Sequence, residues 1–144
     1  MATYAAALDR QDRELLFQCF TDDVEATYSG VNACQGADRI AEYVAAALAP
    51  FSRTQHVMAA SRLLRVGQGE CDVETYCVAY LLERETPTLW TRGLRYLDHM
   101  VFSDDRWLVD QRDQIADWMT SAPAVSPVAM WPGSVAKKDE NGPQ

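Results

Sequence analysis

Hydrophobic residues recur at helical spacing in two segments near the start of the chain. Residues 3–20 are rich in the strong helix formers Ala, Leu, Arg and Glu, and residues 36–51 keep the same period until Pro50. Asp12 is a residue type that caps helices, which favours two short helices meeting near residues 10–12. The predicted buried stripes are Ala5, Leu8, Leu15, Leu16, Cys19 and Phe20, followed by Ile40, Tyr43, Val44, Ala47 and Leu48.

The pattern changes after residue 52. Four segments, 53–66, 71–83, 88–102 and 106–116, are rich in Val, Tyr, Thr, Leu and Trp, which favour strands. They are separated by GQGE, RETPT and SDDR, all typical turn sequences. The earlier segment 21–30 predicts a turn, a short strand and another turn. Helices followed by a four-strand meander indicate an α+β fold, with an antiparallel sheet wrapped over the helices.

The length of 144 residues suits a single domain, which we expect to occupy residues 1–120. Residues 121–144 are rich in Pro, Ser and Ala and end in charged residues. This composition predicts a C-terminal tail whose end is disordered and which could cover a pocket as a lid.

Composition and charge narrow the function. The formal net charge of −8 disfavours nucleic acid and anionic membrane surfaces as partners. No segment is apolar enough to span a bilayer, and the N-terminus lacks an export signal, so we expect a cytoplasmic protein with reduced cysteines. The four cysteines form no CxxC pair, and nucleotide-binding motifs are absent. We therefore expect neither a metal nor a cofactor.

Two titratable residues occupy positions where apolar residues are expected. Asp9 lies seven residues before Leu16, close to two helical turns, and so shares the buried stripe. His56 lies in the apolar run that opens the segment 53–66. A buried Asp that accepts a hydrogen bond from one ring nitrogen of a His leaves the other nitrogen as a general base. The alternatives are that Asp9 ends a first helix facing water and that His56 is a structural residue.

Further side chains could complete such a site. Arg112, Tyr4 and Tyr96 could stabilise negative charge on a substrate oxygen or protonate a departing one. The alternatives are a surface ion pair of Arg112 with Asp110 or Asp113, and simple core packing of the tyrosines. The remaining candidates for substrate contact, in addition to Tyr96, are Trp90, Cys77 and Met58.

Several stretches together resemble a known family. YAAALDRQDRELLFQCFTDD, a helix starting GADRI, RTQH, and GLRYLDHMVFSDDRWLVDQRD follow one another in the order and spacing of the SnoaL-like branch of the nuclear-transport-factor-2-like superfamily. The resemblance covers residues 3–118. It implies a cone-shaped α+β fold in which a strongly curved sheet surrounds the helices and a pocket opens at the wide end.

The resemblance also implies site residues. Members of the family include scytalone dehydratase, bile-acid 7α-dehydratase and hexachlorocyclohexane dehydrochlorinase, in which an Asp of the first helix pairs with a His of a strand. The matching positions are Asp9 and His56, while Tyr4 and Arg112 match further pocket residues. Scytalone dehydratase has a second catalytic His that falls near Glu83 here, where the chain has none. His99 matches no catalytic position and is expected to be structural.

The expected function is that of a cofactor-independent enzyme acting on a small, apolar, multi-ring or polyketide-like carbonyl compound. We expect a dehydratase (lyase) or a cyclase or isomerase of secondary metabolism or of steroid or aromatic breakdown, and the choice among these reactions remains open because one fold hosts many of them. The alternatives are a non-catalytic cone subunit, similar to a dioxygenase β-subunit, and a ligand carrier. The resemblance further implies a homodimer or homotrimer.

Overall fold

The computed structural model describes residues 1–30 and 32–125. It confirms the predicted α+β class, with helices near the N-terminus and long strands after them. The elements are α1 (Ala2–Arg10), α2 (Arg13–Phe17), β1 (Phe20–Tyr28), β2 (Asn32–Gln35), α3 (Ala37–Leu48), β3 (Phe51–Val66), β4 (Glu70–Glu83), β5 (Thr88–Ser103) and β6 (Arg106–Pro123).

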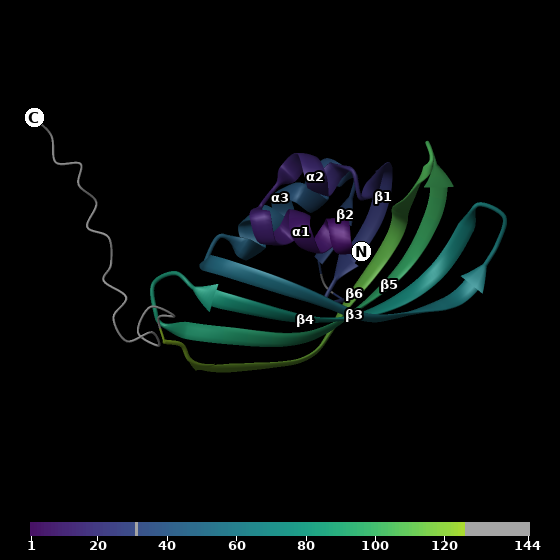
Figure 1. The fold of residues 1–144 in the computed structure, drawn as a ribbon. Helices are drawn as coiled ribbons and strands as arrows, with labels where there is room; N and C mark the ends of the chain where they lie inside the picture. The colour runs from purple at the N-terminus through teal and green to yellow at the C-terminus, as the bar shows by residue number, and fades with distance from the viewer. Residues whose placement is uncertain (31, 126–144) are drawn as a thin grey trace, which may run out of the picture.

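All six strands of the described chain form one sheet in the order β2-β1-β6-β5-β4-β3. Neighbouring strands are antiparallel except β1 and β6, which run parallel. Figure 1 shows that the sheet bends sharply and that the three helices gather on its concave side. Register shifts in β3 after Met58, and between β5 and β6 after Gly93 and His99, mark irregularities that favour such a bend.

The N-terminal helical segment breaks where the sequence predicts. Gln11 has a left-handed backbone (φ 52°) that ends α1. Asp12 then caps α2, since its Oδ1 accepts a hydrogen bond from the backbone N–H of Leu15 at 2.9 Å. The prediction of two short helices meeting near residues 10–12 is therefore confirmed. The break turns the chain so that β1 begins at Phe20, the last residue of the predicted helical segment.

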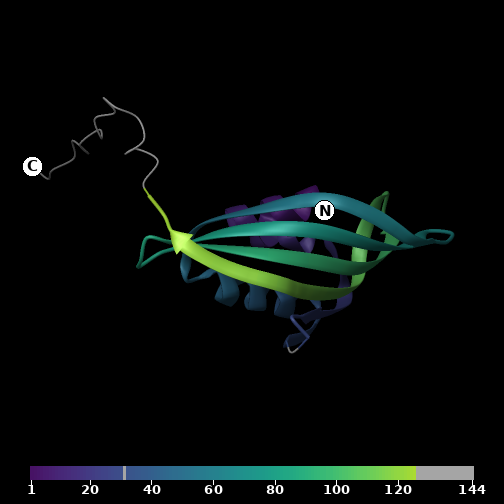
Figure 2. The same cartoon turned by 90° about the horizontal axis from the view of Figure 1, so that it is seen from below.

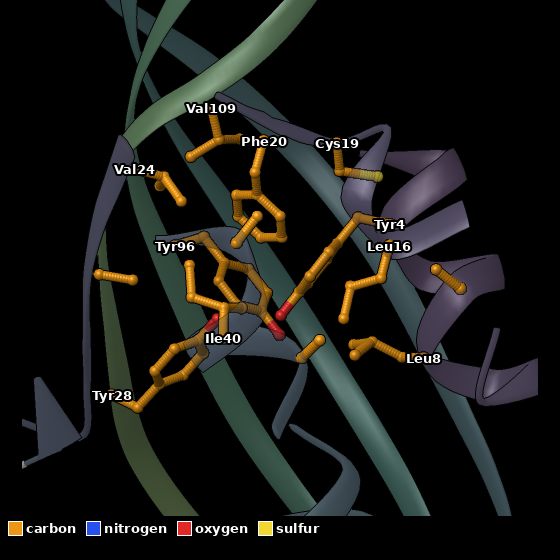
Figure 3. Packing of buried hydrophobic residues seen from close by; sticks show 14 of the residues in the cluster. Tyr4, Leu8, Leu16, Cys19, Phe20, Val24, Tyr28, Ile40, Tyr96 and Val109 are labelled. Carbon is orange, nitrogen blue, oxygen red and sulfur yellow. The ribbon is translucent and has the colours of Figure 1, made fainter. Parts of the chain in front are cut away.

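The core fills the space between the helices and the concave face. Tyr4 and Leu8 of α1 pack beside Phe20 of β1, Ile40 of α3 and Tyr96 of β5 (Figure 3). The Tyr4 ring meets Phe20 and Tyr96 edge-on, with centroids 5.8 and 5.7 Å apart. Aromatic rings thus join both layers of the fold close to the position of Asp9.

Two boundaries differ from the sequence predictions. β6 continues through Pro123, because residues 121–123 pair with residues 88–90 of β5, so these three residues belong to the sheet and not to the tail. A proline is tolerated there because β1 pairs with β6 only over residues 109–114, so β6 is an edge strand at Pro123. The predicted short strand is followed by a second, β2, that the sequence analysis missed. The predicted disordered end and lid, residues 126–144, lie outside the described residues.

The opposite face of the sheet is open. Figure 2 shows β3, β4, β5 and β6 side by side with the helices behind them. Among the described residues this face carries the exposed side chains of Val57, Tyr76, Tyr80 and Trp118. Arg95, which pairs with Tyr76 in the sheet, forms ion pairs with Glu74 and Asp117, so the face combines aromatic and charged side chains. The homodimer or homotrimer expected from the sequence stays a prediction.

Gly93 allows close packing on this open face. A Cβ at residue 93 would overlap the indole of Trp118 on the neighbouring strand. We expect Gly93→Ala to lower the free energy of unfolding by about 1–3 kcal/mol, because the indole must move. Chemical denaturation would measure the loss. In a Trp118→Ala background the same substitution should cost much less, and an equal loss would show that this contact is not the cause.

Candidate active site

The carboxylate of Asp9 is bound by β3. Asp9 lies in the last turn of α1, and its Oδ1 accepts a hydrogen bond from the Thr54 hydroxyl at 3.0 Å. The backbone N–H of His56 donates to the same carboxylate at 3.0 and 3.1 Å, and His56 Nδ1 lies 2.7 Å from Oδ1. An ionised carboxylate only accepts hydrogen bonds, so Nδ1 carries the proton and Nε2 keeps its lone pair.

The His56 ring is enclosed. Its side chain is 6% exposed, against 25% for Asp9. The ring borders a cavity of about 70 Å³ between α1, α3 and the concave face of the sheet. The polar residues bordering this cavity are Tyr4, Tyr28, Tyr43, His56, Arg92, Tyr96 and Gln114, and most of the other bordering residues are aliphatic. The cavity thus places a histidine with a fixed tautomer among several hydrogen-bond donors.

Three tyrosines point their hydroxyls towards one another. Figure 3 shows Tyr4, Tyr28 and Tyr96 arriving from α1, β1 and β5 with their oxygens converging. Burial raises the pKa of Tyr4 and raises the pKa of Tyr28 and Tyr96 well above the usual value of a phenol. All three hydroxyls are therefore protonated near neutral pH. The Tyr28 hydroxyl is buried and has no hydrogen-bond partner among the described residues.

Arg112 lies behind these tyrosines. Its Nε and Nη2 donate to the two carboxylate oxygens of Asp98 at 2.7 and 2.8 Å, and both side chains are almost fully buried. The guanidinium lies 4.2 Å from the ring centroid of Tyr4 and 4.6 Å from that of Tyr96. Burial acts to lower the pKa of Arg112, but the Asp98 carboxylate together with Tyr4 and Tyr28 outweighs this effect, and the net pKa is raised. The alternative of a surface ion pair is wrong, because the partner is the buried Asp98.

The structure brings together only part of the predicted set. Asp9, His56, Tyr4 and Tyr96 lie in or beside the cavity, whereas Arg112 reaches it only through the tyrosine rings. The other predicted substrate contacts, Trp90, Cys77 and Met58, pack against the core but do not border the cavity. The pKa of Cys77 is raised to about 11, by burial first and by the charge of Asp9 second. The thiol therefore stays protonated.

Residues that the sequence analysis missed complete the cavity wall. Arg92 shares its strand face with Trp90 and Tyr96, since alternate residues of a strand point to the same side. The same alternation, applied to the sequence candidates Trp90 and Tyr96, would have predicted Arg92. Tyr28 and Gln114 form a row with Tyr96 across three strands, and this row follows only from the register of β1 with β6.

The chain holds a second His–Asp pair. His99 Nδ1 lies 2.7 Å from Asp72 Oδ1, and Arg65 donates to the other oxygen of Asp72 at 2.7 Å. The hydrogen bonds from Arg65 and His99 lower the pKa of Asp72 to about 2. This pair borders a larger open groove of about 680 Å³ formed by residues of all six strands. Because Asp72 is already neutralised by Arg65 and partly exposed to solvent, it is less suited than Asp9 to stabilise an imidazolium.

Comparisons with known proteins agree with this architecture. A putative scytalone dehydratase from Novosphingobium aromaticivorans superposes with a TM-score of 0.77 at 22% identity, covering 83% of this chain and 80% of that one. The hexachlorocyclohexane dehydrochlorinase LinA-type3 from Novosphingobium barchaimii gives 0.78 at 15% identity, covering 88% of each. ActVI-ORFA from Streptomyces coelicolor gives 0.69 at 19%, covering 81% and 93%. No curated protein sequence matches the chain.

These neighbours and the curved, open sheet define the protein as a member of the nuclear-transport-factor-2-like class of α+β folds. A model of the SnoaL-like domain matches residues 1–113, so the chain belongs to the SnoaL-like family. None of its described helices is both long and apolar enough to cross a membrane. The described residues contain no group of His, Cys, Asp and Glu arranged to hold a metal ion.

The His56 tautomer is testable by ring ¹⁵N NMR. We expect neutral His56 to show a protonated Nδ1 and an unprotonated Nε2, because the Asp9 carboxylate accepts from Nδ1. Asp9→Asn should weaken this preference. Asp72→Asn is the matched control and should alter the signals of His99 only. Unchanged His56 signals in Asp9→Asn would show that the carboxylate does not select the tautomer.

The buried ion pair should dominate local stability. Asp98→Asn leaves the Arg112 charge uncompensated in the core, and we expect a loss of about 3–5 kcal/mol in the free energy of unfolding. Asp113→Asn, an exposed neighbour on β6, should change it by less than about 0.5 kcal/mol. Equal losses in the two variants, measured by urea denaturation, would contradict the importance of the pair.

Proposed function

We propose that the protein is a cofactor-independent enzyme in which His56, oriented by Asp9, removes a proton from carbon next to a substrate carbonyl. The observation that carries the proposal is the geometry of the ring. Its Nδ1 is held at 2.7 Å from Asp9 Oδ1 while the ring itself borders a small, largely apolar cavity. An imidazole that is held through Nδ1 beside such a cavity keeps Nε2 as the nitrogen suited to general-base catalysis.

The charges in the reaction would be balanced as follows. The proton moves from the substrate carbon to His56 Nε2, and the resulting imidazolium is stabilised by the Asp9 carboxylate. The electron pair of the C–H bond moves into the carbonyl, and the protonated hydroxyls of Tyr4, Tyr28 or Tyr96 donate hydrogen bonds to the enolate oxygen. Collapse of the enolate expels a β-hydroxyl, which takes the proton from Nε2 and leaves as water. The net reaction is dehydration.

Isomerisation and cyclisation would begin with the same transfer of a proton from the substrate to His56. Returning the proton to a different carbon gives an isomerase, and attack of the enolate carbon on a second carbonyl of the substrate gives a cyclase. The neighbours named as a putative scytalone dehydratase and a hexachlorocyclohexane dehydrochlorinase support eliminations on this fold. We place dehydration first because the tyrosine hydroxyls and the single base suit elimination of water from a β-hydroxy carbonyl compound.

The cavity limits the substrate in its present form. A volume of about 70 Å³ is well below the roughly 300–1,000 Å³ of typical ligand pockets. A ring-sized substrate therefore requires the side chains of α3 that border the cavity, such as Val44 and Leu48, to move outward. α3 packs on β1, β2 and α2. The side chains of α3 that do not contact these elements have room to shift.

Deuterium exchange tests the proposal without knowledge of the leaving group. We would incubate the protein with 2-tetralone in D₂O and follow loss of the α-proton by NMR. Wild type should exchange the α-proton faster than buffer. His56→Gln should reduce the catalysed rate by about 10²–10⁴-fold, and Asp9→Asn should also reduce it. His99→Gln is the matched control and should exchange like wild type.

The outcomes separate the candidate functions. Equal exchange by wild type and His56→Gln would contradict the assignment of the base. Tight binding of the ketone without exchange would favour the ligand carrier, in which the cavity is kept but no proton is moved.

A further inference from the structure

A partly exposed, positively charged side chain that the proposed mechanism does not use borders the cavity. Arg92 of β5 borders the cavity, and its Nε is buried without a hydrogen-bond partner among the described residues. A buried guanidinium N–H that has lost its water and gained no acceptor is unfavourable. The position therefore requires an explanation beyond packing.

The register places Arg92 directly across the sheet from the base. His56 pairs with Ala79 of β4, and Ala79 pairs with Arg92, so the three residues form one row on the concave face. Two inter-strand spacings put the backbones of His56 and Arg92 roughly 10 Å apart. The residue between them has only a methyl side chain. A ligand lying over Ala79 would contact the imidazole at one end and the guanidinium at the other.

Other charges of the site are already balanced by protein groups. The Asp9 carboxylate accepts hydrogen bonds from Thr54 and His56. The Asp98 carboxylate is neutralised by Arg112. Within the described part of the chain, no carboxylate forms an ion pair with Arg92. An anionic oxygen of the ligand is the natural counter-charge, because a guanidinium binds carboxylates through a fixed pair of donors.

We propose that Arg92 recognises a carboxylate or comparable anionic oxygen, so that the substrate is a small carbonyl compound carrying a negative charge and not a neutral apolar one. The inference rests on the proposed function, since it assigns the opposite end of the ligand whose α-proton His56 removes. The Tyr28 hydroxyl, which borders the same cavity, would supply a further donor to oxygen.

Two matched probes test the inference. We would measure binding of 3-oxocyclohexane-1-carboxylate and of its uncharged carboxamide by isothermal titration calorimetry. Wild type should prefer the carboxylate by at least tenfold. Arg92→Gln should lose this preference while binding the carboxamide as wild type does, and Arg92→Lys should retain part of it. Arg53→Gln, which removes an exposed arginine on β3, is the control for net charge and should behave like wild type.

The readouts distinguish this inference from the proposed function. His56→Gln should keep the preference for the carboxylate over the carboxamide and lose the exchange of the α-proton in D₂O. If His56→Gln exchanges like wild type, the base assignment fails whatever Arg92 does. If wild type shows no preference for the carboxylate, or if folded Arg92→Gln keeps the full preference, the role of Arg92 is overturned. A thermal melt of each variant confirms that it is folded.

Discussion

The carboxylate of Asp9 connects the helical layer to the sheet and orients the histidine of the site. It lies in the last turn of α1, where the negative end of the helix dipole disfavours an anion. Three donors from β3 offset this cost: the Thr54 hydroxyl, the His56 amide and the His56 ring. The amide donor and the ring donor both belong to His56. The carboxylate therefore fixes both the backbone and the ring of this residue. The position of α1 on the sheet and the direction of Nε2 are consequently set by the same contact.

A second buried charge shapes the cavity without touching it. Arg112 lies against the rings of Tyr4 and Tyr96 and is held by Asp98. The cation partly counteracts the effect of burial on the pKa of both tyrosines, which makes their hydroxyls stronger hydrogen-bond donors than burial alone would allow. The sequence analysis expected Arg112 to contact the substrate. In the structure, Arg112 instead acts on the tyrosine hydroxyls that border the cavity. Its position explains how the tyrosine hydroxyls are kept in one place in an apolar interior.

The sequence predicted much of the fold, because helical and strand periodicities are local properties. The break at Gln11 and Asp12 and the four long strands follow from residue type and spacing alone. Asp9 and His56 were suggested by polar residues at apolar positions. The partner of Arg112 could not be chosen, since Asp98, Asp110 and Asp113 are equally plausible until the β5–β6 register is known. The row from His56 to Arg92 likewise depends on pairing between strands that are far apart in sequence.

The parallel pairing of β1 with β6 has a consequence for how the protein folds. These strands are joined by most of the chain between them, and their pairing brings Tyr28 beside Gln114. Such non-local contacts form slowly, because a long loop must close first. On the ribosome, the helices, β1 and β2 would emerge early but lack the strand that joins them to the rest of the sheet. The cavity is thus completed only after β6, the last strand of the described residues, has been synthesised, and until then the inner edge of β1 is open to incorrect partners.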